Sequence, residues 1–358
     1  MLTFASFFSK MGAKMKIKKQ KIAVLPDGKK IHLFTINNGE MSFSATDYGC
    51  TITSIVLPSK SGQKDDIVLG FPSIESYMRN WNCFFGVFVG RFANRIGGTS
   101  FTLNGKKYTL DNNDGGNTLH GGFHGYNRMK WKAEIVETQS GSGVSFTRTS
   151  PDGEQGFPGN VTLEVLYLLN DNNELTMRYR AKTDADTPIN LTNHSYFNLK
   201  GAGNGDILDQ ELSINASSYL EVDNQLIPTG KLISVKGTPF DFTEPKTIGK
   251  DIGKVPGGYD HCFCLNKDAG RLTKCATVRD PNSGRSMTIH TNQPGVQFYA
   301  ANSVNGVCGK NGDIYNKHSA LCLETQQYPD FPNKPDFPQC ILRPNEQFEA
   351  ITVHSFAW

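Results

Sequence analysis

The sequence predicts an all-β protein, a large antiparallel β-sandwich or barrel that folds as a single domain. The first observation is a hydrophobic period of two in many segments, as half-buried strands require. The second is that turn-forming clusters, drawn from 36 glycines and 17 prolines, interrupt the apolar runs at short intervals. The third is that the composition stays similar along the 358 residues, with neither a break nor an internal repeat that would mark a second domain.

The elements can be followed in order along the chain. A short helix is predicted around PSIESYMRNW, with Ser73 as its N-cap. Strands are predicted at residues 143–149, 160–169, 174–182 and 286–291 (GVSFTRT, NVTLEVLYLL, ELTMRYRAK and SMTIHT). LPDGKK, LNDNNE and RDPNSGR are typical of the turns between strands. Ordered structure is expected from about Ile22, so we predict one domain over residues 22–358.

Residues 1–21 are interpreted as a basic, flexible extension. Much of the small net charge of +3 comes from the lysines of KMGAKMKIKKQK, and no basic patch with interleaved aromatic residues follows. This pattern predicts neither a nucleic-acid nor a membrane partner. MLTFASFF is too short to span a membrane, and its lysines follow the apolar run, which argues against a secretory signal. A weak organelle-targeting role stays open.

The eight cysteines indicate the compartment. They contain no CxxC pair, and several lie in apolar runs, where a free thiol behaves as a small hydrophobic side chain. We therefore expect reduced cysteines in a cytoplasmic protein. The balanced charge is compatible with a monomer or a weak dimer.

Polar residues concentrate in a few segments that an ordinary β-sandwich does not need. These are GRFANRIGG (90–98), NTLHGGFHG (117–125), NLTNHSYFNL (190–199), GGYDHCF (257–263) and LCLETQQYPDFPN (321–333). NLTNHSYFNL is expected to form a strand whose alternate residues face a polar cavity. Its histidine, His194, can donate or accept a proton near neutral pH. Glu324 is expected at the end of an apolar strand, where desolvation raises the pKa of a carboxyl group and suits it to act as a base.

The remaining candidates are fixed hydrogen-bond donors: Asn94, Arg95 and His120. His120 and His124 have the spacing of a helical metal pair, but the glycines around them argue against a helix, so no metal is predicted. No cofactor-binding loop is found either. This inventory indicates proton transfer on a neutral, polyhydroxylated ligand. Phe92, Tyr196 and Phe298 are candidates to lie against the apolar face of a sugar ring.

Six motifs, five of them from these segments, occur in the order and spacing of one known family: GRFANRIGG, TLHGG, NLTNHSYFNL, GYDHCF, PGVQFYA and LETQQYPDFPN. The chain after about Ile22 resembles the aldose 1-epimerases, the galactose mutarotases. The resemblance implies a single-domain antiparallel β-supersandwich without metal or cofactor. It also implies interconversion of the α and β anomers of an aldose substrate such as galactose or glucose.

The resemblance also assigns roles to residues of this chain. Glu324 falls on the general base, His194 on the general acid and His120 on a second active-site histidine. Substrate-binding positions of the family fall on Asn94, Arg95, Asp260 and Gln297. In the implied reaction Glu324 takes the proton of the anomeric hydroxyl while His194 protonates the ring oxygen. The acid and the base are expected on opposite sides of the sugar ring.

Three alternatives stay open at this point. A non-catalytic sugar-binding module would reuse the same pocket. An epimerase of hexose 6-phosphates would need extra cationic residues, for which the sequence offers Arg79, Arg91 and Arg128. A glycoside hydrolase would normally use two carboxylates, and Glu324 with Asp260 is the available pair.

Overall fold

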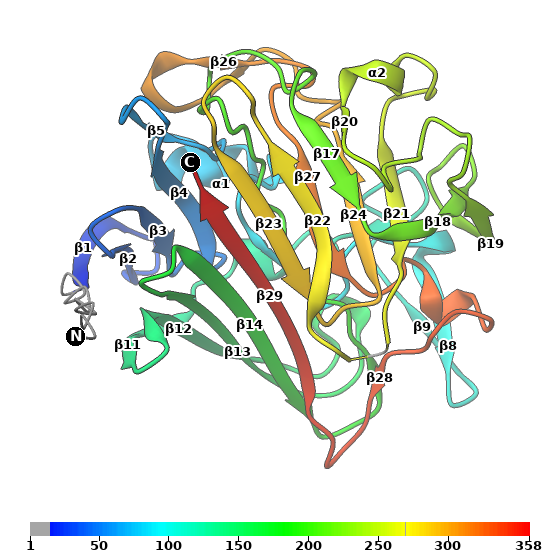
Figure 1. The fold of residues 1–358 in the computed structure, drawn as a ribbon. Coiled ribbons are helices and arrows are strands. Elements are labelled where there is room, and N and C mark those ends of the chain that lie inside the picture. Colours follow the sequence, from blue (N-terminus) through cyan, green and yellow to red (C-terminus); the bar gives the residue numbers. More distant parts are fainter. Residues whose placement is uncertain (1–14, 269) are drawn as a thin grey trace, which may run out of the picture.

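The computed structural model describes residues 15–268 and 270–358. It contains three larger antiparallel sheets, and two of them face each other as the layers of a sandwich (Figure 1). The predicted all-β antiparallel architecture is confirmed. Each layer consists of segments from distant parts of the chain, so the sandwich closes only when the whole chain has folded.

The larger layer has nine strands. In spatial order they are β11 (Lys132–Thr138), β12 (Gly141–Ser150), β13 (Val161–Leu169), β14 (Glu174–Thr183), β29 (Phe348–Ala357), β23 (Ser286–Thr291), β22 (Thr273–Arg279), β17 (Glu211–Ile214) and β20 (Lys246–Thr247). The C-terminal strand β29 lies between β14 and β23 and joins the two halves of this layer. Alternate residues of β14 are buried, as the period of two in its sequence predicts. The strands predicted at residues 143–149, 160–169, 174–182 and 286–291 are all present here.

The second layer, which we call the site sheet, has five strands. Their order is β19 (Pro228–Ser234), β18 (Ala216–Val222), β21 (Asp260–Leu265), β24 (Gly295–Tyr299) and β27 (Cys322–Gln326). One contiguous hydrophobic core fills the space between the layers, with Tyr179 and Phe356 from the larger layer and Phe298 and Leu323 from the site sheet. β27 is buried along its whole length. The site sheet is therefore held firmly from one side.

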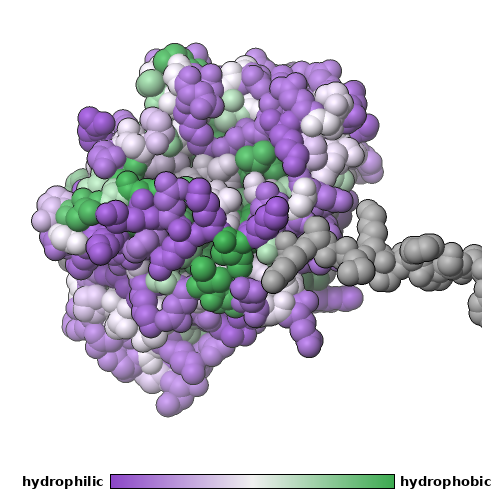
Figure 2. All heavy atoms as spheres, turned by 90° about the vertical axis from the view of Figure 1, so that its left-hand side faces the viewer, coloured by the Kyte–Doolittle hydropathy of each residue, from purple (hydrophilic) through white to green (hydrophobic). Residues whose placement is uncertain are grey.

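The N-terminal strands form the third sheet. They are β1 (Lys16–Val24), β2 (Lys30–Asn37), β3 (Ser42–Thr46), β4 (Thr51–Pro58) and β5 (Lys64–Asp66). β1 begins before Ile22, so the expected start of ordered structure falls inside this strand, while residues 1–14 lie outside the described residues. β1 is an exposed, lysine-rich edge strand, and charged side chains discourage pairing with other chains. Figure 2 shows this side of the molecule as mainly hydrophilic with scattered apolar patches.

Short elements connect the sheets and surround the site. Five of these elements are two-stranded ribbons. The paired strands are β6 (Phe88–Val89) with β16 (Thr192–Asn193), β7 (Arg95–Ile96) with β10 (Thr118–Leu119), β8 (Ser100–Leu103) with β9 (Lys106–Thr109), β15 (Thr187–Pro188) with β28 (Ile341–Leu342) and β25 (Val307–Cys308) with β26 (Ile314–Tyr315). The α-helices of the described residues are α1 (Ile74–Arg79) and α2 (Gly249–Ile252), and six single-turn 3-10 helices accompany them. Ser73 caps α1 as predicted, since its side chain accepts a hydrogen bond from the Ser76 amide. Within the described ranges, no helix is long and apolar enough to cross a membrane.

The stretch at residues 190–199 differs from its prediction. Only Thr192 and Asn193 are in strand conformation, although nearly every residue of the stretch is buried. Its backbone bonds to several segments in turn, with the amides of Asn190, His194 and Phe197 donating to the carbonyls of Arg91, Val87 and Leu321. The Asn190 amide donates to the carbonyl of Ala93, and the Asn193 amide donates to the carbonyl of Gly86. The expectation of a regular strand is wrong because the stretch changes its backbone partner every few residues, while its asparagine side chains bond to carbonyls of the neighbouring loop.

Candidate active site

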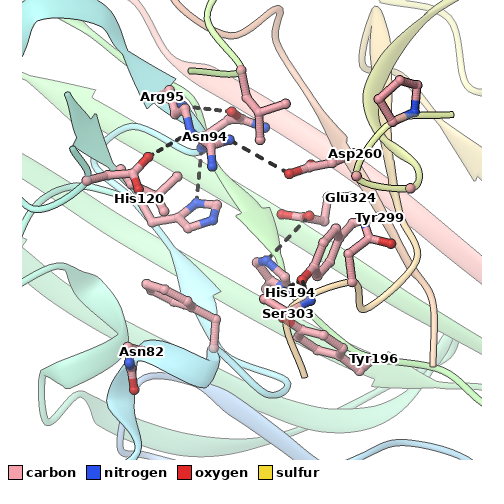
Figure 3. Close-up of a pocket in the computed structure, with 18 residues that line it drawn as sticks. Asn82, Asn94, Arg95, His120, His194, Tyr196, Asp260, Tyr299, Ser303 and Glu324 are labelled. Carbon is pink, nitrogen blue, oxygen red and sulfur yellow. Dashed lines mark hydrogen bonds and ion pairs between the residues drawn. The ribbon is translucent and has the colours of Figure 1, made fainter. Parts of the chain in front are cut away.

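A cavity of about 420 Å³ opens beside the site sheet. Figure 3 shows that side chains converge on it from β24, β27 and the start of β21, and from the loops at residues 82–95, 114–120 and 190–199. Six of the seven predicted site residues line this cavity: Asn94, Arg95, His120, His194, Asp260 and Glu324. The structure thus brings together residues that are up to 230 positions apart in the sequence, from Asn94 to Glu324.

Glu324 lies in the middle of β27 rather than at its end, because the strand continues to Gln326. Its side chain is only 2 % exposed, and its Oε2 has no hydrogen-bond partner among the described residues. Burial, together with the nearby charge of Asp260, raises the pKa of the Glu324 carboxyl well above its ordinary value, and Arg95 opposes this shift. The expected raised pKa thus has its cause in burial within the strand. A carboxyl group in this position is a proton acceptor of unusual strength.

His194 follows β16, and its ring lies between two aromatic side chains. The ring stacks on Tyr196 at a centroid distance of 5.0 Å and on Phe84 at 5.8 Å. These faces leave only the edge of the imidazole free for polar contacts. Burial lowers the pKa of His194 to about 4, so the ring is neutral at neutral pH unless a neighbour stabilises its charge.

Glu324 and His194 form a close pair. The distance from His194 Nε2 to Glu324 Oε1 is 3.5 Å. No sugar ring fits between atoms at this distance, so the expectation that they flank the ring from opposite sides is wrong. The physical reason is that O1 and O5 of a pyranose are both bonded to C1. A base for one oxygen and an acid for the other must therefore face the same edge of the ring.

His120 is held in a defined protonation state. Its Nδ1 accepts a hydrogen bond of 3.1 Å from the backbone amide of Asn94, which places the ring proton on Nε2. Burial, together with the charges of His194 and Arg95, lowers the pKa of His120 well below its usual value. The ring is thus a neutral donor directed at the cavity. Phe84 also packs against it, at a centroid distance of 4.7 Å.

Arg95 lies between two carboxylates. Its Nε donates to Asp114 Oδ2 at 2.7 Å, and its NH1 is 3.9 Å from Asp260 Oδ2. Gln297 does not line the cavity, but its Nε2 donates to Asp260 Oδ1 at 2.6 Å. The predicted residue Gln297 therefore contacts the site through its side chain at Asp260, and on β24 it lies directly opposite Glu324 of β27. Burial raises the pKa of Asp260, and Arg95 opposes that rise.

Sequence reasoning overlooked several lining residues. Asp114 and Phe84 were not singled out, although both contact predicted site residues. Phe84 has a φ of 56°, which is unusual for a bulky side chain, and no sequence pattern announces that conformation. Tyr196 lines the cavity as expected. Phe92 and Phe298 do not, because both are fully packed in the hydrophobic clusters of the interior.

His120, His194 and Glu324 also have the residue types of a metal site. Their ligand atoms lie within 4.8 Å of one another, whereas His124 is exposed and does not line the cavity. The hydrogen bond at Nδ1 of His120 leaves no lone pair on Nε2 for a metal ion. The geometry of this cluster therefore favours proton transfer.

The arginines considered for a phosphate group lie elsewhere. Arg91 is buried and donates to Ser150 and Thr187, Arg128 packs over Trp81, and Arg79 ends α1. Among the described residues that line the cavity, Arg95 is the one lysine or arginine, and two carboxylates already contact it. The cavity consequently suits a neutral ligand better than an anionic one.

Known proteins match this chain over most of its length. The sequence profile of the aldose 1-epimerase family matches residues 32–355. Galactose mutarotase from Mus musculus is 44 % identical over 332 residues, which is 92 % of this chain and 95 % of that protein. Galactose mutarotase from Homo sapiens is 42 % identical over the same shares. Aldose 1-epimerase from Escherichia coli is 36 % identical over 342 residues, 93 % of this chain and 97 % of that protein.

Solved structures agree with these matches. An aldose epimerase homologue from C. elegans superimposes with a TM-score of 0.83 and 30 % identity, covering 96 % of this chain and 99 % of that one. Galactose 1-epimerase from Lactobacillus acidophilus gives a TM-score of 0.84 at 28 % identity, with the same coverage. The fold, the cavity and the similarity over almost the entire sequence lead to one conclusion: this chain belongs to the aldose 1-epimerase family.

Proposed function

We propose that this protein is a cofactor-independent aldose 1-epimerase that interconverts the α and β anomers of neutral hexoses such as galactose and glucose. The observation that carries the proposal is the buried pair of Glu324 and His194, 3.5 Å apart at the wall of a cavity of about 420 Å³. A carboxyl group of raised pKa beside a histidine of lowered pKa is a matched base and acid. The names of the relatives support the same reaction.

In the proposed reaction the shared proton of the resting, neutral pair first passes from Glu324 to His194 Nε2 across their 3.5 Å contact, so the pair that reacts with the sugar is carboxylate and imidazolium. Glu324 takes the proton of the C1 hydroxyl while His194 Nε2 gives its proton to the ring oxygen, and the C1–O5 bond breaks. The open aldehyde rotates about C1–C2. Both proton transfers then reverse and close the ring on the other face. The pair ends as it began, so no external donor or acceptor is consumed.

The other lining residues hold the sugar. His120 presents Nε2–H as a neutral donor, and Asn94, whose backbone amide binds His120 Nδ1, also lines the cavity. Arg95 and Asp260 offer a donor and an acceptor for ring hydroxyls, and Gln297 positions Asp260. A 6-phosphate would meet no unpaired arginine or lysine among the described lining residues and would be repelled by the carboxylates. We therefore expect free sugars to be preferred over their 6-phosphates.

We further propose that residues 22–358, together with the first half of β1 from Lys16, act as one domain, with a cytoplasmic location and a monomeric or weakly dimeric state. The eight cysteines, which all lie in the described part of the chain, are free thiols, as expected for a reducing compartment. The single core shared by the two layers supports one folding unit.

Polarimetry of freshly dissolved α-glucose and α-galactose tests the proposal directly. The wild-type protein should accelerate mutarotation, and both Glu324→Gln and His194→Asn should abolish most of the acceleration. Glucose 6-phosphate, measured in parallel, should react more slowly. A wild-type protein that binds galactose but leaves the rate at the uncatalysed drift would make it a sugar-binding module instead.

A further inference from the structure

Cys322 contacts the ring nitrogen of His194 that faces away from Glu324. Its Sγ lies 3.5 Å from His194 Nδ1, and it is the one side chain in the described part of the chain that hydrogen-bonds with this nitrogen. Cys322 and His194 are both buried, at 0 % and 5 % exposure. The thiol lies in an apolar run of the sequence, where it was interpreted as a small hydrophobic residue.

The geometry of β27 explains why Cys322 and Glu324 contact the two nitrogens of the same imidazole ring. Cys322 and Glu324 are two positions apart on β27, so their side chains project from the same face about 7 Å apart. An imidazole edge fits between them, with Nδ1 at the thiol and Nε2 at the carboxylate. Stacking on Phe84 and Tyr196 prevents the ring from tilting out of this position.

The proposed reaction sets a requirement for Nδ1. Nε2 must lose its proton to the ring oxygen and regain it in every turnover, so the proton on Nδ1 must stay in place throughout. Nδ1–H then needs an acceptor in both states of the ring. A carboxylate in that position would stabilise the imidazolium and weaken it as an acid. A thiol sulfur is a weak, neutral acceptor and leaves the imidazolium acidic.

We propose that Cys322 is a positioning residue that acts through His194: its sulfur accepts the hydrogen bond of Nδ1–H and leaves Nε2 as the nitrogen that exchanges a proton with the sugar. This inference rests on the proposed epimerase function. Burial raises the pKa of the Cys322 thiol well above its ordinary value, so the sulfur stays uncharged near neutral pH.

The tautomer of His194 tests this assignment independently of activity. Protein labelled with 15N-histidine is examined by NMR near neutral pH, and the His194 signals are identified by their loss in His194→Asn. In the wild type we expect the proton on Nδ1. Cys322→Ala should shift the population towards Nε2–H and lower kcat roughly five- to tenfold, the effect of one weak hydrogen bond, with little change in KM. Cys322→Ser should recover part of both effects, because its oxygen is also an acceptor but reaches less far.

Cys275→Ala is the matched control. Cys275 is as deeply buried as Cys322 but lies on β22 of the other layer, so its truncation should lower stability without changing the tautomer or kcat. A wild-type ring protonated on Nε2, or a Cys322→Ala variant with unchanged tautomer and kcat, would overturn the role of Cys322 while leaving the epimerase function in place. A wild type without mutarotation would overturn both.

Discussion

Glu324→Gln should remove activity and raise stability in the same variant. Glutamine has nearly the shape of glutamate but accepts no proton, so the sugar can still bind while the base is lost. General base catalysis contributes typically about 10²–10⁴-fold, and we expect kcat to fall by this factor. KM should change little, because the side chain is buried in β27 and its neighbours remain in place.

The stability effect follows from the raised pKa of the carboxyl. In the unfolded chain the group ionises around its ordinary value of 4.5, whereas burial keeps it protonated to higher pH in the folded protein. Folding is therefore undisturbed below pH 4.5 and is progressively weakened as the pH rises above it. At about 1.4 kcal/mol per pH unit, the penalty at pH 7 has a ceiling of about 3.5 kcal/mol, and glutamine avoids it.

Urea denaturation of wild type and Glu324→Gln between pH 4.5 and 8 measures this difference. The two curves should nearly coincide at the acid end and separate as the pH rises. Glu154→Gln is the matched control, because Glu154 is also largely buried but pairs with Arg148 and accepts from Ser150. It should lose roughly 1–3 kcal/mol and keep its kcat. A Glu324→Gln variant that retains more than a tenth of kcat, or that is destabilised at pH 7, would refute the reasoning.

Three further results are expected. Asp114→Asn should raise KM about fivefold with a smaller change in kcat, because Arg95 loses a partly exposed ionic partner; an unchanged KM would contradict this. His354→Leu should make the free energy of unfolding fall less steeply below pH 6.5. The His354 imidazole is buried, has no hydrogen-bond partner among the described residues and has its pKa lowered to about 3, so it takes up a proton only on unfolding. Equal acid sensitivity of wild type and variant in urea titrations would exclude this cause. The rate of mutarotation should be constant across neutral pH. It should fall near pH 4, where the pair of His194 and Glu324 takes up a second proton. A fall in rate close to pH 6.5 would contradict the burial of the pair.

The regular strands were the most predictable part of the fold. β12, β14 and β23 combine alternating side chains with clear turn signals, and the structure has them within two residues of the predicted limits. β1 was missed because most of its residues are exposed and many are lysines, so its sequence has no clear alternation of apolar and polar residues. The stretch at 190–199 was misjudged for a different reason: its apolar content indicated one strand, but its backbone bonds in turn to segments far away in the sequence, which no local pattern contains.

The members of the site were predictable, whereas their arrangement was not. Glu324 and His194 could be selected because carboxylates and histidines rarely occur in such apolar surroundings without a purpose. Their separation depends on how β27 approaches the loop after β16, which no local pattern contains. Cys322 had a usable signal, since it lies two residues before Glu324 on a strand and must share its face. Asp114 had none, because an aspartate in a glycine-rich turn has many ordinary explanations.

An epimerase works in both directions, and the burial of the pair serves this symmetry. Burial raises the proton affinity of Glu324 and lowers that of His194, so it opposes the order of the free groups, in which histidine binds a proton more tightly than a carboxylate. Ring opening transfers a proton to Glu324 and removes one from His194, and ring closure does the reverse. A strong ionic partner on either residue would trap the proton at one stage and slow one half of the reaction. The surroundings of both residues interact weakly, since Oε2 of Glu324 has no hydrogen-bond partner among the described residues and a thiol lies beside His194 Nδ1, so the proton is not held at one stage by a strong ionic partner of this kind.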